Sequence, residues 1–279
     1  MFLIATVTAA LLAFYITVAV VPTVRGWLSD PAQEPDGPES FGVGHAWIAV
    51  RSVDIDQVIA TLGLTGVTPC NWSTGLAVVE DPQHSASYVF VTPPVDGWTF
   101  VVGLALPYPA GRDYHDACLA LMLALGKRFD EVQYFYACPD VGLTGWARFA
   151  ETKLRRAFAW GDEGVIWNRG TPDATEQALG LKVLRMRERS EARGAIDEDE
   201  RGYPEALHAV QVAAGWSLDP ETFSRLPGDP ALGFLGVVPR TWAVRRINRK
   251  ATITPPPVRM MRRTHAIDKR ETSSLGQSD

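Results

Sequence analysis

The side chains with the clearest chemical potential occupy one short stretch, in which a histidine lies between two carboxylates. His115 is preceded by Asp113 and followed by Asp116, and such a trio could tune an imidazole as a general base or ligate a metal. The same residues are predicted to form the first turn of a helix over residues 113–127, where the helix dipole favours acids in any case. Without a second His or Glu four residues on, a metal has one clear anchor, and we predict no metal and no cofactor.

The three cysteines offer a second, weaker possibility. Cys70, Cys118 and Cys138 are odd in number, widely spaced and free of any CxxC pattern, which is a poor disulfide framework and a poor zinc site. Cys70 could act as a nucleophile if His45 or His84 approached it. The simpler interpretation is buried or incidental thiols. Because GxGxxG, GxxxxGK[ST], HExxH and GxSxG are also missing from the sequence, the chain leans towards a non-enzymatic role.

An uncharged apolar run, residues 2–21, opens the chain, and Arg25 is the first charged side chain after it. Twenty helical residues rise about 30 Å, the thickness of the hydrocarbon core of a bilayer. We predict a single-pass membrane anchor at residues 1–28 that binds the plasma or inner membrane. A cleaved signal peptide and a buried core helix are the alternatives, both weakened by the length of the run and the signal peptide also by the lack of a basic residue before it.

Charge is distributed unevenly along the 279 residues. From Arg240 onward ten Lys and Arg oppose three acids, a net charge of +7, and residues 1–239 carry −12. The tail is expected to meet anionic lipid, with folding back onto the acidic body as the competing idea; a specific nucleic-acid partner is not expected, since such proteins carry positive charge on a folded face. The predicted membrane-surface residues are Trp27, Arg245, Arg246, Arg249, Lys250, Arg259, Arg262 and Arg263. Arg25, the basic tail and the unpaired thiols favour a cytoplasmic body.

Four regions follow from this pattern: the anchor, an acidic Pro-rich linker over 29–41, a globular domain over 42–239, and a basic disordered tail over 240–279. In the first half of the domain we predict a strand at 45–50 and a helix that Asp54 caps and Gly63 ends. Strands at 75–80, 87–92 and 98–106 then follow, with Cys70 and residues 71–74 in a loop before them. The strongly apolar helix over 113–127 is expected to be buried.

The second half of the domain is richer in strands. Strands are predicted at 131–137, 146–151, 153–160 and 164–168, with a helix starting at Thr171-Pro172 and another over 204–216. The charged segment 182–201 is expected to be a solvated loop or a frayed helix. The fold class is therefore α+β, with antiparallel sheets and helices packed on one face. Of the nine tryptophans, Trp47, Trp98, Trp160 and Trp167 fall in predicted strands, where core packing is favoured over an exposed platform for a partner.

Two stretches, Val89–Gly103 (VFVTPPVDGWTFVVG) and Arg155–Gly170 followed by Thr171-Pro172, resemble sequences of uncharacterised bacterial proteins. Some of those proteins look like immunity or partner-binding components of toxin systems, and the resemblance supplies no catalytic positions. We therefore expect a membrane-anchored, non-enzymatic binding protein, immunity- or scaffold-like, with a protein partner. The alternative is a membrane-tethered hydrolase whose site forms around Asp113, His115 and Asp116.

Overall fold

The fold is taken from a computed structural model, which describes residues 34–110, 114–162, 164–181, 184, 202–243 and 245–246. The predicted anchor, the first part of the linker, nearly all of segment 182–201 and the tail from residue 247 lie outside the described residues. None of the helices within the described residues is both long enough and apolar enough to cross a membrane.

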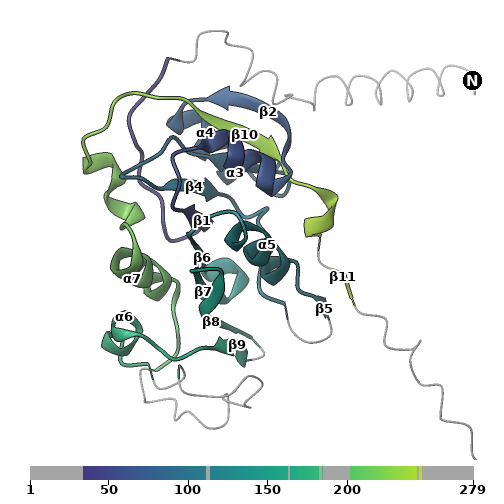
Figure 1. Ribbon diagram of the computed structural model, residues 1–279, viewed down its shortest axis with the longest axis vertical. Helices are drawn as coiled ribbons and strands as arrows, with labels where there is room; N and C mark the ends of the chain where they lie inside the picture. The colour runs from purple at the N-terminus through teal and green to yellow at the C-terminus, as the bar shows by residue number, and fades with distance from the viewer. Residues whose placement is uncertain are drawn as a thin grey trace, which may run out of the picture. The chain divides into compact units, whose positions relative to one another are not determined.

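Within the described residues, nine strands form one antiparallel sheet in the order β2-β10-β3-β4-β1-β6-β7-β8-β9 (Figure 1). These strands are β1 (Ala46–Val50), β2 (Thr65–Cys70), β3 (Tyr88–Val91), β4 (Thr99–Val102), β6 (Glu131–Cys138), β7 (Leu143–Ala150), β8 (Lys153–Gly161), β9 (Gly164–Arg169) and β10 (Gly233–Val237). The short strands β5 (Tyr114–His115) and β11 (Arg245–Arg246) pair separately. The α+β class and the antiparallel sheet are thus confirmed.

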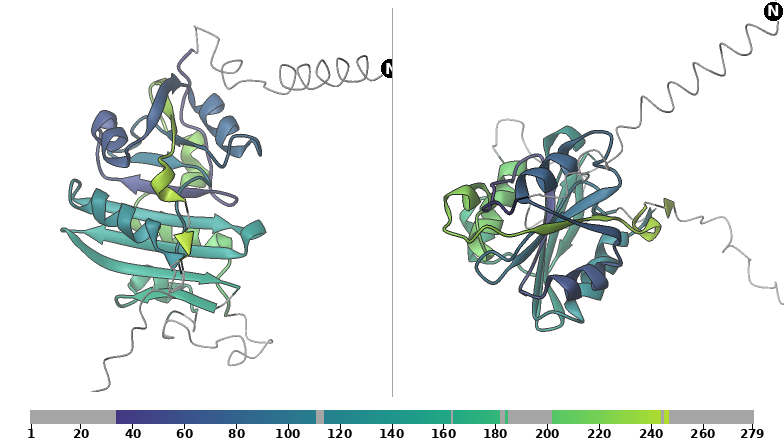
Figure 2. Two further views of the ribbon diagram at one scale, coloured as in Figure 1. Left: turned by 90° about the vertical axis from the view of Figure 1, so that its right-hand side faces the viewer. Right: turned by 90° about the horizontal axis from the view of Figure 1, so that it is seen from above.

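Both faces of the sheet are apolar. β1 is buried along its whole length, and successive side chains of a strand point to opposite faces. Trp47 and Ala49 accordingly enter one apolar cluster, and Ile48 and Val50 enter another. A sheet with two apolar faces must be covered on both, and helices lie on either side of it (Figure 2). The prediction that helices pack on one face only is therefore wrong.

The two covers are made by different parts of the chain. The first face carries α4 (Trp72–Glu80), α6 (Ala174–Ala178) and α7 (Ala206–Trp216). The opposite face carries α3 (Ile55–Leu62), α5 (Ala117–Gly126) and the 3-10 helix η5 (Arg240–Trp242). The described residues also include the 3-10 helices η1 (Pro139–Val141) and η4 (Pro220–Arg225). Below, the face that carries α4, α6 and α7 is called the α4/α7 face, and the face that carries α3, α5 and η5 is called the α3/α5 face.

Several predicted elements are confirmed. β1 and the four strands β6 to β9 fall where expected, with small shifts of their ends. α3 begins after Asp54, whose Oδ1 accepts a 2.9 Å hydrogen bond from Gln57 N, and ends at Gly63 with a φ of 69°. Glycine is the residue that adopts this left-handed conformation without strain. Local capping chemistry was sufficient to place this helix.

The strand predicted at 75–80 is wrong, since these residues belong to α4. Asn71 Oδ1 caps the helix by accepting from Thr74 N at 3.0 Å. Asp36 accepts from Trp72 N at 2.6 Å and from Ser73 N at 3.0 Å, so the free N–H groups of the first turn are satisfied. The missing strand is β2, which lies where we expected a loop. Asp36 is 36 positions before Trp72, too distant for a local pattern to reveal.

Two other helices begin at residues other than those predicted. α5 begins at Ala117 because Asp116 is its N-cap, so the predicted first turn over 113–116 is not helical. α6 is capped by Asp173, not Thr171: Asp173 and Glu176 form a reciprocal capping box. β4 covers Thr99–Val102, less than the predicted 98–106. Of segment 182–201 the structure describes Leu184, which is buried in the core of the α4/α7 face.

The described end of the predicted linker, residues 34–41, lies against the domain. Besides capping α4, Asp36 forms a bridge with Ala231. Asn71 Nδ2 donates to the Glu34 carbonyl at 3.1 Å, and Phe41 is buried in the core of the α4/α7 face. The ordered body therefore starts before residue 42 and uses acidic residues as structural caps.

Gly75→Ala tests the close packing of α4 on the sheet. Alanine gains about 1 kcal/mol in helix propensity over glycine, but its Cβ would lie 2.3 Å from Cδ2 of Phe90 in β3. Overpacking of this kind costs about 1–3 kcal/mol, so we expect a net loss of about 1 kcal/mol in the free energy of unfolding, measured with urea. Gly37→Ala, where the added Cβ meets nothing within 4 Å, is the control and should be neutral. A stabilised Gly75→Ala protein would contradict the placement of α4.

Candidate functional site

Asp116 is the best-defined member of the predicted trio, and both its carboxylate oxygens are already engaged. Oδ1 accepts from Leu119 N at 2.9 Å, and Oδ2 accepts from Trp167 Nε1 at 2.9 Å. Burial raises the pKa of Asp116, and these two hydrogen bonds oppose the increase. The carboxylate thus joins the start of α5 to β9, which is a structural role.

Of the other two members of the trio, the structure describes His115. His115 is exposed in β5, where its backbone pairs with Arg245 of β11, and Asp113 lies outside the described residues. Among the residues that the structure describes, no group of three His, Cys, Asp or Glu side chains could hold a metal ion. The geometry therefore gives Asp116 a capping role and leaves the His115 side chain at the surface.

The thiols are buried, as the simpler interpretation predicted. Burial raises the pKa of Cys70 to about 12 and that of Cys118 well above its usual value. Cys70 directly precedes α4, whereas His45 Nε2 lies 3.0 Å from Glu80 Oε1 at the other end of that helix. Nine helical residues separate those ends by about 13 Å. His84 pairs with Asp81 instead, so neither histidine is a base for Cys70.

Seven tryptophans, among them Trp47, Trp98 and Trp167, are buried, and Trp160 is half-buried against the ring of Tyr203. The predicted core packing of strand tryptophans is therefore confirmed, and Trp27 lies outside the described residues. An exposed aromatic platform on the four predicted strand positions is not formed.

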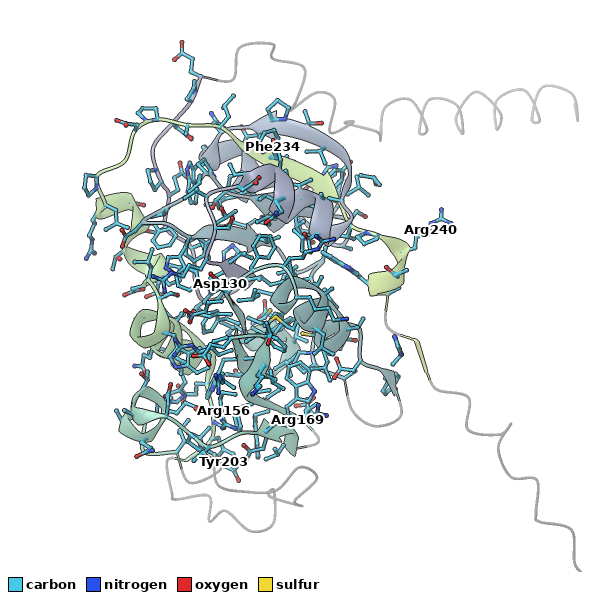
Figure 3. The ribbon with its side chains drawn as sticks, in the orientation of Figure 1. Asp130, Arg156, Arg169, Tyr203, Phe234 and Arg240 are labelled. Carbon is cyan, nitrogen blue, oxygen red and sulfur yellow. The ribbon has the colours of Figure 1, made fainter. Side chains whose placement is uncertain are left out.

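A buried ion pair, which the sequence did not lead us to expect, joins Arg156 of β8 to Glu176 of α6; Arg156 is labelled in Figure 3. Arg156 Nε lies 2.7 Å from Glu176 Oε1 and 2.8 Å from Oε2, and the side chains are 3% and 0% exposed. Trp146 Nε1 of β7 donates to the same carboxylate at 2.8 Å. Arg156 Nη1 donates to Asn168 Oδ1 of β9 at 2.7 Å. The pair ties α6 to three strands.

A second buried carboxylate, that of Glu131, supports the end of α7 through Gln133. Glu131 Oε1 lies 2.7 Å from Arg148 Nη2 and accepts from Gln133 Nε2 at 2.9 Å. Gln133 Nε2 also reaches the carbonyl of Trp216, the last residue of α7, at 3.2 Å. Arg148 and Arg156 stand opposite each other on neighbouring strands, a repulsive arrangement unless each has its own acid. In the sequence, the local sign of these buried charges is the three-residue spacing from Asp173 to Glu176, which is typical of a capping box.

Carboxylates also gather at the surface, beside α4 and the segment that precedes β1. Burial raises the pKa of Glu39, and the nearby charges of Asp36 and Glu80 raise it further. A Cβ on Gly42 would lie 2.8 Å from Glu221 Cγ, so a fourth acid, from η4, borders this segment. We call Asp36, Glu39, Glu80 and Glu221 the acidic cluster. Its crowded negative charge would be relieved by a cationic partner.

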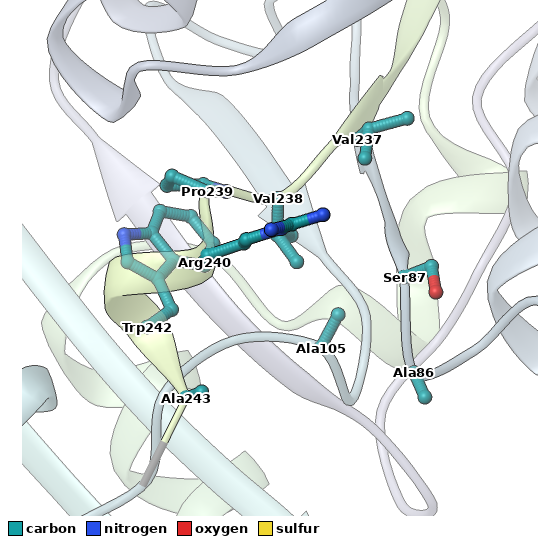
Figure 4. A pocket seen from close by; sticks show the side chains of 9 residues that line it. All are labelled: Ala86, Ser87, Ala105, Val237, Val238, Pro239, Arg240, Trp242 and Ala243. Atoms are coloured by element: carbon teal, nitrogen blue, oxygen red, sulfur yellow. The ribbon is translucent and has the colours of Figure 1, made fainter. Parts of the chain in front are cut away.

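A cleft of about 340 Å³ opens where the chain leaves β10 (Figure 4). Ala86, Ser87 and Ala105 form one part of its wall, and Arg240 and Trp242 form another. Arg240 extends across it in Figure 4. A guanidinium and a hydroxyl can hold an anion, but the lining supplies neither a carboxylate nor an imidazole for acid-base work.

Of the predicted membrane-surface residues, the structure describes the backbones of Arg245 and Arg246 in β11. Trp27, Arg249, Lys250, Arg259, Arg262 and Arg263 lie outside the described residues. Comparison with known proteins found no matching family model, curated protein or solved structure.

The thiol burial gives a direct chemical test. At pH 8 the native protein should react with an aromatic disulfide reagent at least about a hundredfold more slowly than the urea-unfolded chain, because the thiolate is the reactive form. Ser73→Cys places a thiol at an exposed position near the start of α4 and should be labelled at once. Rapid labelling of Cys70 in the native protein would contradict its buried, protonated state.

Proposed function

We propose that this chain is a membrane-anchored binding protein, not an enzyme, whose folded body holds a basic protein partner. Residues 2–21 form the anchor in this proposal, and the body faces the cytoplasm of a bacterial cell. Arg25, the basic tail and the unpaired thiols support that orientation. Val89–Gly103 and Arg155–Gly170 resemble stretches of uncharacterised bacterial proteins, some of which look like immunity or partner-binding components, and this resemblance supports a neutralising or scaffolding role.

The observation that carries the proposal is the acidic cluster. Its carboxylates come from three separate parts of the chain. Burial raises the pKa of Glu39, and the charges of Asp36 and Glu80 lie close enough to raise it further. Residues 1–239 also carry a net charge of −12. Bringing like charges together costs free energy, which a partner of opposite charge recovers on binding. A negative field additionally speeds the encounter with a basic protein.

The hydrolase alternative receives less support from the geometry. A general base needs a lone pair directed at substrate, and each Asp116 oxygen already accepts a structural hydrogen bond. The raised pKa values of Cys70 and Cys118 keep those thiols protonated at neutral pH, whereas a nucleophilic cysteine needs a lowered pKa. We therefore propose binding in preference to hydrolysis.

A photocrosslinking experiment on the full-length protein in its own membrane tests this proposal. Benzoylphenylalanine at Val43, an exposed position of the segment between Glu39 and β1, should capture one dominant basic protein, identified by mass spectrometry. The same probe at Lys153, the exposed first residue of β8 at the opposite end of the strands, should not capture it. The double change Glu39→Gln/Glu80→Gln should reduce the yield about tenfold or more, as expected for loss of two attractive charges.

The matched control removes two charges elsewhere. Asp130→Asn/Glu151→Gln removes the same number of negative charges at the Lys153 end and should leave the Val43 crosslink unchanged. Equal yields from Val43 and Lys153, or a Val43 crosslink that survives Glu39→Gln/Glu80→Gln, would overturn the proposal.

A further inference from the structure

The outer side of α5 is apolar and exposed. Ala120, Leu123 and Ala124 form a stripe at helical spacing, and Leu123 is 41% exposed. The sequence predicted that this strongly apolar helix would be buried; its inner side is, and the outer stripe is not. Tyr114, in the strand just before the helix, is 42% exposed as well.

Positive charge lies at the end of this stripe and in the groove beside it. Lys127 continues the stripe one turn beyond Leu123, and Arg128 follows it. The groove between α3 and α5 is lined by Gln57, Ala60, Thr61, Ala124, Lys127 and Arg128. In the part of the chain that the structure describes, this lining carries two cations and no acid. Among the described residues, neither cation takes part in a salt bridge.

The basic tail leaves the body next to the same helix. η5, which contains the exposed Arg240, packs against α5. β11 then pairs with β5 immediately before α5. The tail beyond residue 246 contains Arg249, Lys250, Arg259, Arg262 and Arg263. Cations thus occur both at the end of α5 and at the point where the tail departs.

We propose that the α3/α5 face lies on the anionic surface of the bilayer, with Leu123 and Tyr114 at the headgroup level and Lys127 and Arg128 against lipid phosphates. This inference rests on the membrane anchoring proposed above. Apolar and tyrosine side chains bordered by Lys and Arg are the usual composition of an interfacial surface. Lipid phosphate supplies the charge that the lining of the groove lacks.

The charges on the α3/α5 face favour one orientation of the body. Lys127 and Arg128 at the end of α5 attract an anionic bilayer, and the exposed acids Asp54 and Asp56 at the start of α3 oppose this attraction. The acidic cluster borders α4, which lies on the opposite face of the sheet. Docking in this way turns the acidic cluster away from the lipid and towards the cytoplasm, where a protein partner can reach it.

Site-specific quenching in reconstituted vesicles tests the docking. Full-length protein carrying Ala124→Cys is labelled with an environment-sensitive fluorophore and placed in vesicles of phosphatidylcholine and phosphatidylserine that contain a headgroup-level nitroxide lipid. We expect strong quenching of this label, and none for Leu207→Cys, an exposed position of α7 on the other face. Lys127→Gln/Arg128→Gln should weaken docking about fivefold for each cation removed, as should phosphatidylcholine alone or high salt.

Each other outcome overturns the proposal. Equal quenching at the two positions, or quenching that persists after Lys127→Gln/Arg128→Gln, would show that this face is not held by anionic lipid. A spectral shift of the Ala124→Cys label in detergent, without lipid and dependent on protein concentration, would assign the face to a second copy. Failure of the docking alone would leave the Val43 crosslink intact, whereas failure of the partner proposal would remove that crosslink and leave the quenching in place.

Discussion

The buried ion pair between Arg156 and Glu176 is the interaction on which one side of this molecule depends. Both charges are removed from water, which costs several kcal/mol per ion unless geometry and further hydrogen bonds compensate. Compensation comes from a two-oxygen contact with Arg156 Nε and from the donors of Trp146 and the Asp173 backbone. α6 is five residues long, too short to be stable alone, so this pair and its packing against α7 hold it on the sheet.

Other carboxylates of this fold also hold helices in place, and the charged groups that do not have this role lie at the surface. Glu131 accepts from Gln133, which contacts the end of α7, Asp116 caps α5, and Asp36 accepts from the first turn of α4. These acids position helices on a sheet whose two faces are both apolar, and Asp36 also contributes its charge to the acidic cluster. The chemistry left at the surface is electrostatic: an acidic cluster on the α4/α7 side and a cationic, apolar surface on the α3/α5 side. The proposed function assigns the first surface to a protein partner, and the further inference assigns the second to the membrane.

Sequence reasoning succeeded where the determining contacts are local. Asp54 and Gly63 placed α3, because capping acts within a few positions. Aromatic-rich runs placed β6 to β9, because aromatic side chains favour strands. It failed for α4, although Asn71 is a local cap, and the additional acceptor Asp36 is distant in sequence. It also failed for the number of covered faces, although a continuous apolar run such as AWIAV is consistent with a strand buried on both faces. The candidate site could not be foreseen for a similar reason. Arg156 and Glu176 are 20 positions apart and meet only because β8 and α6 stack, and the acidic cluster assembles from three segments.

The central claim is that the buried charges of this body are structural, and a double-mutant cycle measures it most directly. The proteins Arg156→Met, Glu176→Gln and the double variant would be unfolded with urea beside the natural chain. Each single change should cost about 3–5 kcal/mol because it leaves one buried charge without its partner. The double variant should cost less than the sum by at least about 2 kcal/mol, since removing both charges removes the penalty. Single changes that are neutral or stabilising, as is common when a residue is kept for function at the expense of stability, would contradict the account.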